Sequence, residues 1–173
     1  MEKLHLYLVR HCESLGNREN IFQGQLDLDI SATGEKQLAL LALRFRNIPI
    51  DAVYSSPLKR AYKTAEAVDL YHSLPIIKLP ELMEVDVGAL SGMKLDKAFA
   101  DYPVFAEKWQ NSPQNCIFPE GETTAEVYDR AKKALARVKA DCMGQTAVIT
   151  SHGFLLRCMA CEILEHDIEC LSD

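Results

Sequence analysis

Two histidines follow apolar runs near the two ends of the chain. Arg10 and His11 come directly after the run Leu4–Val9, and His152 comes shortly after the run 146–150. A neutral imidazole can attack phosphorus when its other nitrogen is held as a hydrogen-bond donor, and an arginine side chain can bind two phosphate oxygens at once. These residue types therefore indicate phosphoryl-transfer chemistry.

Two further residues could complete such a site. Arg60 follows the predicted strand 51–55 and supplies a second guanidinium group. Glu84 follows the predicted strand 75–79 and could protonate the leaving oxygen. Each residue taken alone at the end of a strand is more often structural or solvated, so the prediction depends on the combination.

The residues that carry this chemistry stand between alternating strand-like and helix-like patterns. Apolar residues recur at helical spacing behind Ser31 and Thr123, which we predict to be N-caps, with Glu126 completing a capping box. Such alternation favours an α/β domain with a mainly parallel sheet, whose chemistry gathers beyond the carboxyl ends of the strands. The predicted strands are Leu4–Val9, 51–55, 75–79 and 146–150, and the predicted helices begin near 31, 57, 123 and 154.

The segment from 84 to 119 differs from the rest because it combines glycines, prolines and short helical pieces. We predict an excursion that covers a site in the manner of a lid. Trp109 lies within it and has two interpretations, since it could line the pocket or belong to the core.

Composition limits the partners. The formal net charge is −6, from 19 Lys and Arg against 25 Asp and Glu, whereas nucleic-acid and acidic-membrane binders favour a basic balance. The apolar runs are shorter than the ~20 residues of a membrane span, and no leader pattern is visible. We therefore expect a cytoplasmic protein. A small phosphorylated metabolite stays compatible with the acidic balance as a partner, because a phosphate site needs only a few convergent basic groups.

Six cysteines stand in a chain that is long enough to form a core without disulfide bonds. Cys158 and Cys161 have the spacing of a redox or metal pair, but they lie in an apolar helical stretch. We expect both to be reduced thiols in the core, where cysteine is often found.

The motifs around these residues form an ordered set. In chain order they are Leu8-Val9-Arg10-His11 with Glu13-Ser14 and Asn17, Phe22-Gln23-Gly24 with Leu26-Asp27, Thr33-Gly34-Glu35, Tyr54 to Ala61, Leu82 to Gly88, Gly121-Glu122 and Ser151-His152-Gly153. Together they resemble the histidine phosphatase (phosphoglycerate mutase-like) superfamily across nearly the whole chain. The resemblance implies a three-layer sandwich with helices on both faces of a mainly parallel sheet.

The resemblance also implies roles. His11 would form a phosphohistidine, and Glu84 would protonate the leaving oxygen and then activate water. No metal or other cofactor is implied, and the expected state is a monomer or a homodimer. The groups implied to hold the phosphoryl oxygens or the substrate are Arg10, Asn17, Gln23, Gly24, Arg60, His152 and Gly153.

Cys12 departs from the family, which has glycine after the nucleophilic histidine. A side chain here could narrow the pocket, and a thiol beside cationic groups could have a lowered pKa and be open to oxidation. The same substitution creates the HCx5R pattern of cysteine-dependent phosphatases, with Cys12 as nucleophile and Arg18 as phosphate clamp. That alternative leaves Arg60, Glu84 and His152 unexplained.

Four other points stay open in the sequence. Family members continue past the final helix into a further strand, so we expect one domain over 1–173 that lacks this strand. A phosphoglycerate mutase is a further alternative, although mutases carry a longer segment between Glu84 and Gly121 than the small phosphatases that this chain resembles. The residues 89–119 would set the substrate. The remaining alternative is a phospho-ligand binder without turnover.

Overall fold

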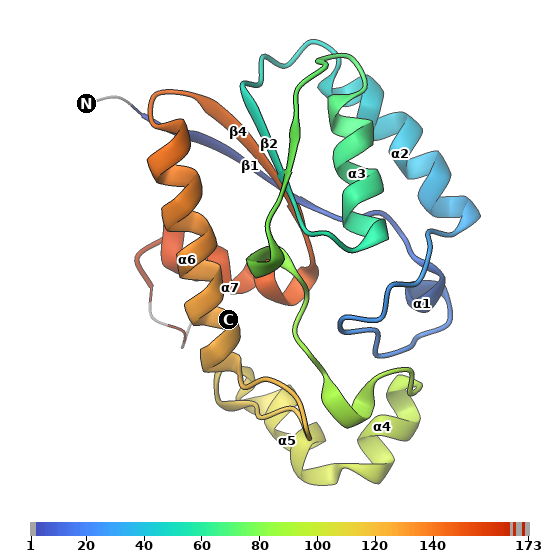
Figure 1. The fold of residues 1–173 in the computed structure, drawn as a ribbon. Coiled ribbons are helices and arrows are strands. Elements are labelled where there is room, and N and C mark those ends of the chain that lie inside the picture. The colour runs from blue at the N-terminus through green and yellow to red at the C-terminus, as the bar shows by residue number, and fades with distance from the viewer. Residues whose placement is uncertain (1–2, 167, 169–170, 172–173) are drawn as a thin grey trace.

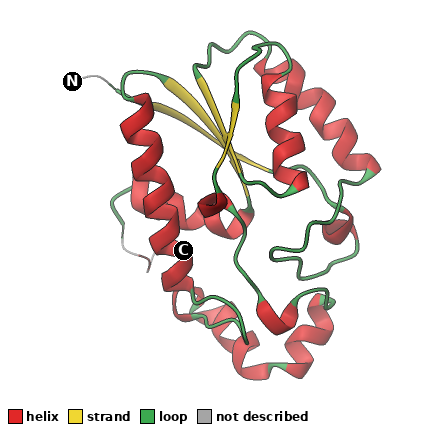
Figure 2. Cartoon of the chain, in the orientation of Figure 1, coloured by secondary structure: helices red, strands yellow, loops and turns green. Residues whose placement is uncertain are grey.

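A parallel four-stranded sheet forms the centre of the computed structural model, which describes residues 3–166, 168 and 171 (Figures 1 and 2). The strand order is β1-β4-β2-β3, and each neighbouring pair is parallel. The carboxyl ends of all four strands therefore meet at one edge. The strands are β1 (His5–Arg10), β2 (Ala52–Ser55), β3 (Ile76–Lys78) and β4 (Thr146–Ser151).

Helices cover both faces of this sheet, which confirms the predicted three-layer α/β sandwich (Figure 1). Side chains alternate between the faces of a strand. Val53 and Val148 accordingly pack with Phe45 on the side of α2 and α3, whereas Tyr54 and Ile149 join the larger core beneath α6 and α7. These helices are α2 (Ala32–Phe45), α3 (Lys59–Asp69), α6 (Thr124–Cys142) and α7 (Gly153–Ile163).

The predicted caps are confirmed at two helices. Ser31 accepts a hydrogen bond from the Gly34 N–H at the start of α2, and Thr123 forms a capping box with Glu126 at the start of α6. The helix predicted to begin near residue 57 begins two residues later, at Lys59. Leu58 is the N-cap of α3, so Pro57 precedes the helix instead of opening it.

Short helices follow β3 in the segment predicted to be an excursion. They lie beyond the carboxyl edge of the sheet, as Figure 2 shows. Six aromatic rings pack against one another between these helices and the main body, and they are Phe22, Phe99, Phe105, Trp109, Phe118 and Phe154. The short elements are η1 (Pro80–Leu82), η2 (Gly88–Leu90), α4 (Leu95–Asp101), α5 (Pro103–Asn111) and η3 (Pro113–Asn115), while α1 (Leu15–Arg18) lies earlier in the chain.

Cys158 and Cys161 are buried in the core, as predicted, and they do not pair with each other because Cys158 is a free thiol. The expectation of a reduced thiol is wrong for Cys161, which is disulfide-bonded. Among the described residues, none of the helices has the length and apolar character of a membrane span. The absence of a further family strand stays a prediction.

Candidate active site

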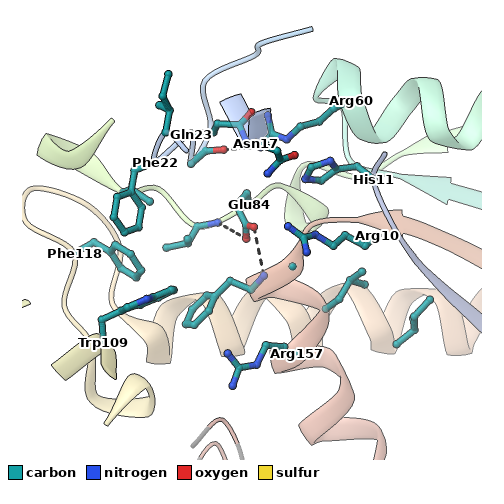
Figure 3. Close-up of a pocket in the computed structure, with 18 of the residues that line it drawn as sticks. Arg10, His11, Asn17, Phe22, Gln23, Arg60, Glu84, Trp109, Phe118 and Arg157 are labelled. Carbon is teal, nitrogen blue, oxygen red and sulfur yellow. Dashed lines mark hydrogen bonds between the residues drawn. The ribbon is translucent and has the colours of Figure 1, made fainter. Parts of the chain in front are cut away.

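A cavity of about 650 Å³ opens where the carboxyl ends of the strands meet the excursion (Figure 3). One wall is polar, and the opposite wall includes Phe22, Trp109 and Phe118. Both interpretations of Trp109 therefore hold, since it lines the cavity and packs against other aromatic rings. The predicted site residues that line the cavity are Arg10, His11, Asn17, Gln23, Gly24, Arg60, Glu84 and Gly153.

His11 is held as a neutral imidazole with one nitrogen available. Its Nδ1 lies 2.6 Å from the backbone oxygen of Cys12. Because a carbonyl can only accept, Nδ1 must carry the proton, which leaves the Nε2 lone pair free. Burial lowers the pKa of His11 to about 4, and the positive charges of Arg60 and Arg10 act in the same direction. The imidazole therefore suits nucleophilic attack near neutral pH.

Cys12 lacks the properties of a nucleophilic cysteine. Its N–H donates to Thr64 Oγ1 at 3.1 Å, and burial raises the pKa of its thiol, so the predicted lowered pKa is wrong. Arg18 is exposed and pairs with Glu19 at 3.6 Å. A cysteine-dependent phosphatase needs a thiolate and an arginine that binds the phosphate beside it. Here the raised pKa favours the neutral thiol of Cys12, and Arg18 is paired with Glu19 at the surface.

Arg60 is almost fully buried at the start of α3 and holds the loop that follows α1. Its Nη1 donates to the carbonyl of Leu26 and its Nη2 to that of Gly24, each at 2.8 Å. Its Nε has no hydrogen-bond partner among the described residues. Since a guanidinium has five N–H donors, Arg60 can hold the loop and still bind an oxygen in the cavity.

Two glycines near the guanidinium groups lie so close to neighbouring residues that a side chain would crowd them. Gly24 has a φ of +50°, and a Cβ there would lie 2.6 Å from a methyl carbon of Val87. Gly153 begins α7, and a Cβ there would lie 3.4 Å from Nε of Arg10. Arg10 therefore lies directly over the N-terminus of α7.

Ser14 orients two amide side chains on the polar wall. Its hydroxyl lies 2.7 Å from Oε1 of Gln23, and its backbone N–H donates to Oδ1 of Asn17 at 3.1 Å. Because both amide oxygens are engaged, the NH₂ groups of Asn17 and Gln23 remain for a ligand. Gly16 makes room for this arrangement, since a Cβ there would lie 2.4 Å from the Gln23 side chain.

Glu84 lies at the N-terminus of α7, where its carboxylate accepts hydrogen bonds from three backbone N–H groups. Val85 donates at 3.1 Å, and Phe154 and Leu155 donate at 3.3 Å each. Figure 3 draws the first two of these bonds as dashed lines. Removal of water from around the carboxyl raises the pKa of Glu84, although the three donors and Arg60 oppose that change. A carboxyl with a raised pKa can deliver a proton near neutral pH.

Arg130 on α6 holds the segment that carries Glu84, and sequence reasoning missed it. Its guanidinium donates to the carbonyls of Met83 at 2.5 Å and Glu84 at 3.0 Å, and it pairs with Glu122 at 2.7 Å. In the sequence Arg130 is one of several charged residues on a long helix. The neighbouring Gly121-Glu122 motif was the only signal that could have led to it.

His152 is the predicted site residue that does not line the cavity. It is fully buried at the N-cap of α7, and its ring centroid lies 5.1 Å from that of His11. Burial and the nearby charge of Arg60 lower the pKa of His152 well below its ordinary value. His152 is therefore a second neutral imidazole whose ring lies next to that of His11.

The fold and the site define a class of protein. The neutral imidazole of His11, two guanidinium groups and a carboxyl of raised pKa line one cavity at the carboxyl edge of a parallel sheet, and the second neutral imidazole, that of His152, lies next to His11. The described residues contain no group of three or more histidine, cysteine or acidic side chains that could hold a metal ion. The family model of the histidine phosphatase superfamily (branch 1) matches residues 6–173, and the chain belongs to this superfamily.

Relatives with different names are similar to this chain in sequence, and a solved structure shares its fold. Phosphoserine phosphatase 1 of Hydrogenobacter thermophilus is 39% identical over 94% of this chain and 77% of its own length. A probable phosphoglycerate mutase, GpmB of Escherichia fergusonii, is 32% identical over 93% of this chain and 75% of its own length. The structure of YhfR from Bacillus stearothermophilus has a TM-score of 0.91 with 27% identity, and covers 97% of this chain and 83% of its own.

Proposed function

We propose that this protein hydrolyses small phosphomonoesters through a phosphohistidine intermediate on His11. The observation that carries the proposal is the arrangement of His11 and Glu84. The imidazole has its proton committed to the Cys12 carbonyl, and the carboxyl of raised pKa lines the same cavity (Figure 3). A nucleophile and an acid are thus available to one bound phosphate ester.

The first half of the reaction forms a P–N bond and breaks a P–O bond. The Nε2 lone pair of His11 attacks phosphorus while Glu84 gives its proton to the leaving oxygen. The transferred group carries negative charge, which Arg10 and Arg60 neutralise. The neutral donors for its oxygens are the NH₂ groups of Asn17 and Gln23 and the imidazole of His152.

The second half returns the enzyme to its starting state. Glu84, now a carboxylate, takes a proton from a water molecule, which attacks phosphorus and breaks the P–N bond to His11. Inorganic phosphate leaves, and both His11 and Glu84 regain their original protonation. In a phosphoglycerate mutase the same phosphohistidine would instead give its phosphoryl group to a second hydroxyl, so the acceptor distinguishes the two activities.

The substrate is proposed to be a small metabolite. The named activity of the Hydrogenobacter thermophilus relative, phosphoserine phosphatase, supports a small substrate. A cavity of about 650 Å³ has room for one, and the acidic net charge of −6 disfavours nucleic acid or an acidic membrane as partner. We propose a cytoplasmic monomer or homodimer.

The test is hydrolysis of p-nitrophenyl phosphate and phosphoserine by the wild type, His11→Ala and Cys12→Ser, with a chelator present. We expect an active wild type, an inactive His11→Ala and an active Cys12→Ser. Loss of activity in Cys12→Ser alone would establish the cysteine mechanism instead. Phosphoryl transfer between two phosphoglycerates without release of phosphate would establish a mutase, and phosphate binding without turnover would establish a binder.

A further inference from the structure

Ser56 contacts His152 from the neighbouring strand. It directly follows β2, which pairs with β4, and both residues are fully buried. Nε2 of His152 lies 2.8 Å from Oγ of Ser56. The backbone of Ser56 is held by its N–H, which donates to the Thr150 carbonyl at 3.0 Å. The Ser56 hydroxyl is therefore held against the His152 ring.

The hydrogen-bond partners of Ser56 decide where its proton goes. Its oxygen already accepts the N–H of Leu58 at 3.3 Å. Within the described part of the chain, Nε2 of His152 is the only acceptor near the hydroxyl proton, and Nδ1 of His152 is buried without a partner. Two arrangements of the protons are consistent with these distances.

In the first arrangement, the Ser56 hydroxyl donates to Nε2, and the imidazole proton is on Nδ1. In the second, Nε2 donates to Ser56, which leaves the hydroxyl proton without an acceptor and points a lone pair of Nδ1 at its surroundings. A buried donor without an acceptor is costly. A lone pair on Nδ1 would also repel a phosphoryl oxygen, whereas an N–H would bind it. In the free state the first arrangement leaves one buried group without a partner, the N–H at Nδ1, whereas the second leaves two, the hydroxyl proton and the Nδ1 lone pair. In the bound state the N–H at Nδ1 would also gain a phosphoryl oxygen as its acceptor.

We infer that Ser56 is a positioning residue whose hydroxyl keeps the His152 proton on Nδ1, as the donor for a phosphoryl oxygen. This inference rests on the proposed function, in which His152 holds the phosphoryl group. The tautomer matters because His152 is neutral: burial and the positive charges of Arg60, Arg130 and Arg10 lower its pKa. A doubly protonated imidazole would donate from both nitrogens and would need no orientation.

The tautomer can be read directly by nitrogen NMR of the imidazole rings. The chain has five histidines, so the signals of His152 are identified by their loss in His152→Gln. We expect the wild type to carry the proton on Nδ1. We expect Ser56→Ala to lose that preference and to populate both tautomers. A wild-type proton on Nε2, or an unchanged tautomer in Ser56→Ala, would overturn the inference.

Ser55→Ala is the matched control, since Ser55 is equally buried and its hydroxyl bonds the Ser56 carbonyl and Thr150 but not His152. We expect kcat/KM to fall about tenfold in Ser56→Ala and to change less than about twofold in Ser55→Ala. Ser56→Thr keeps the hydroxyl and should restore both the tautomer and the rate. Equal losses in the two alanine variants would contradict a positioning role.

Two readouts keep this test separate from the proposed function. The wild-type spectrum alone decides the tautomer, even if Ser56→Ala does not fold. A wild type without phosphatase activity would refute the proposed function, whereas the spectrum reports on Ser56 and His152 regardless of turnover.

Discussion

The carboxylate of Glu84 accepts a hydrogen bond from the N–H of Phe154 in the first turn of α7. The start of a helix stabilises a negative charge, while the loss of water around the carboxyl favours the neutral acid. The net result is a raised pKa for Glu84. This contact joins the Glu84 carboxylate to the first turn of α7, the helix that has His152 as its N-cap.

Glu84→Gln removes the proposed acid and keeps the shape of the side chain. We expect the single-turnover rate of His11 phosphorylation to fall about 100-fold or more with phosphoserine, whose alkoxide leaves poorly without a proton. With p-nitrophenyl phosphate, whose leaving group is stable as an anion, the fall should be less than about tenfold. Rapid quenching measures both rates, and Glu81→Gln, on the exposed neighbouring turn, is the control. Equal falls for both esters would remove Glu84 from the role of acid.

Arg130→Gln should destabilise the protein and misplace Glu84. The substitution leaves the Glu122 carboxylate without its partner and frees the carbonyls of Met83 and Glu84. We expect the free energy of unfolding to fall by about 3 kcal/mol, as for other partly buried ion pairs. Arg137→Gln, at an exposed pair on the same helix, should cost less than about 1 kcal/mol. Denaturant titration measures both, and similar losses would contradict the assigned role of Arg130.

Ser14→Ala should weaken substrate binding through Gln23, whereas the Asn17 amide oxygen keeps its bond to the backbone N–H of Ser14. Without the hydroxyl, the Gln23 amide loses the contact that fixes its oxygen. We expect KM to rise about tenfold with a smaller change in kcat, which corresponds to one lost hydrogen bond to a charged ligand. If the serine acts through Gln23, the double variant with Gln23→Ala should bind substrate no more weakly than Gln23→Ala alone. Additive losses would show that Ser14 acts independently.

The buried His11 should make the protein less stable in mild acid. Its pKa in the folded state is about 4, below the ordinary value of 6.5, so between these values the unfolded chain binds more protons. This contribution is present above pH 6.5 and is lost as the pH falls toward 4, by up to about 3 kcal/mol. His11→Gln should show a flatter pH dependence of unfolding than the wild type. His5→Gln, at an exposed position, should match the wild type. Parallel curves for His11→Gln and the wild type would contradict the lowered pKa.

Much of the arrangement of strands and helix caps was predictable because it depends on residues that are close together in the sequence. The apolar runs before His11 and His152 place both at the ends of strands, and neighbouring parallel strands bring those ends together. The caps at Ser31 and Thr123 depend on residues only three positions away. The helix α1 was missed because four residues are too short to show a helical period.

The contacts that support the site could not be predicted in the same way. Arg60 was expected to bind phosphate, yet its partners at Gly24 and Leu26 are more than thirty residues away in the chain. Arg130 has no distinctive neighbours in sequence, and although Ser56 lies in the Tyr54 to Ala61 motif, its contact with His152 arises from packing between separate elements, as do the contacts of Arg130. The disulfide bond of Cys161 likewise left no pattern in an apolar helix.

The most direct test of the account is to trap the phosphoenzyme. Brief reaction with a radiolabelled phosphomonoester, followed by denaturation, should leave a label on the protein that is lost in acid and kept in alkali, as for phosphohistidine. Peptide mapping should place it on His11, with no label in His11→Ala and full label in Cys12→Ser. A label that persists in His11→Ala and disappears in Cys12→Ser would contradict the central claim.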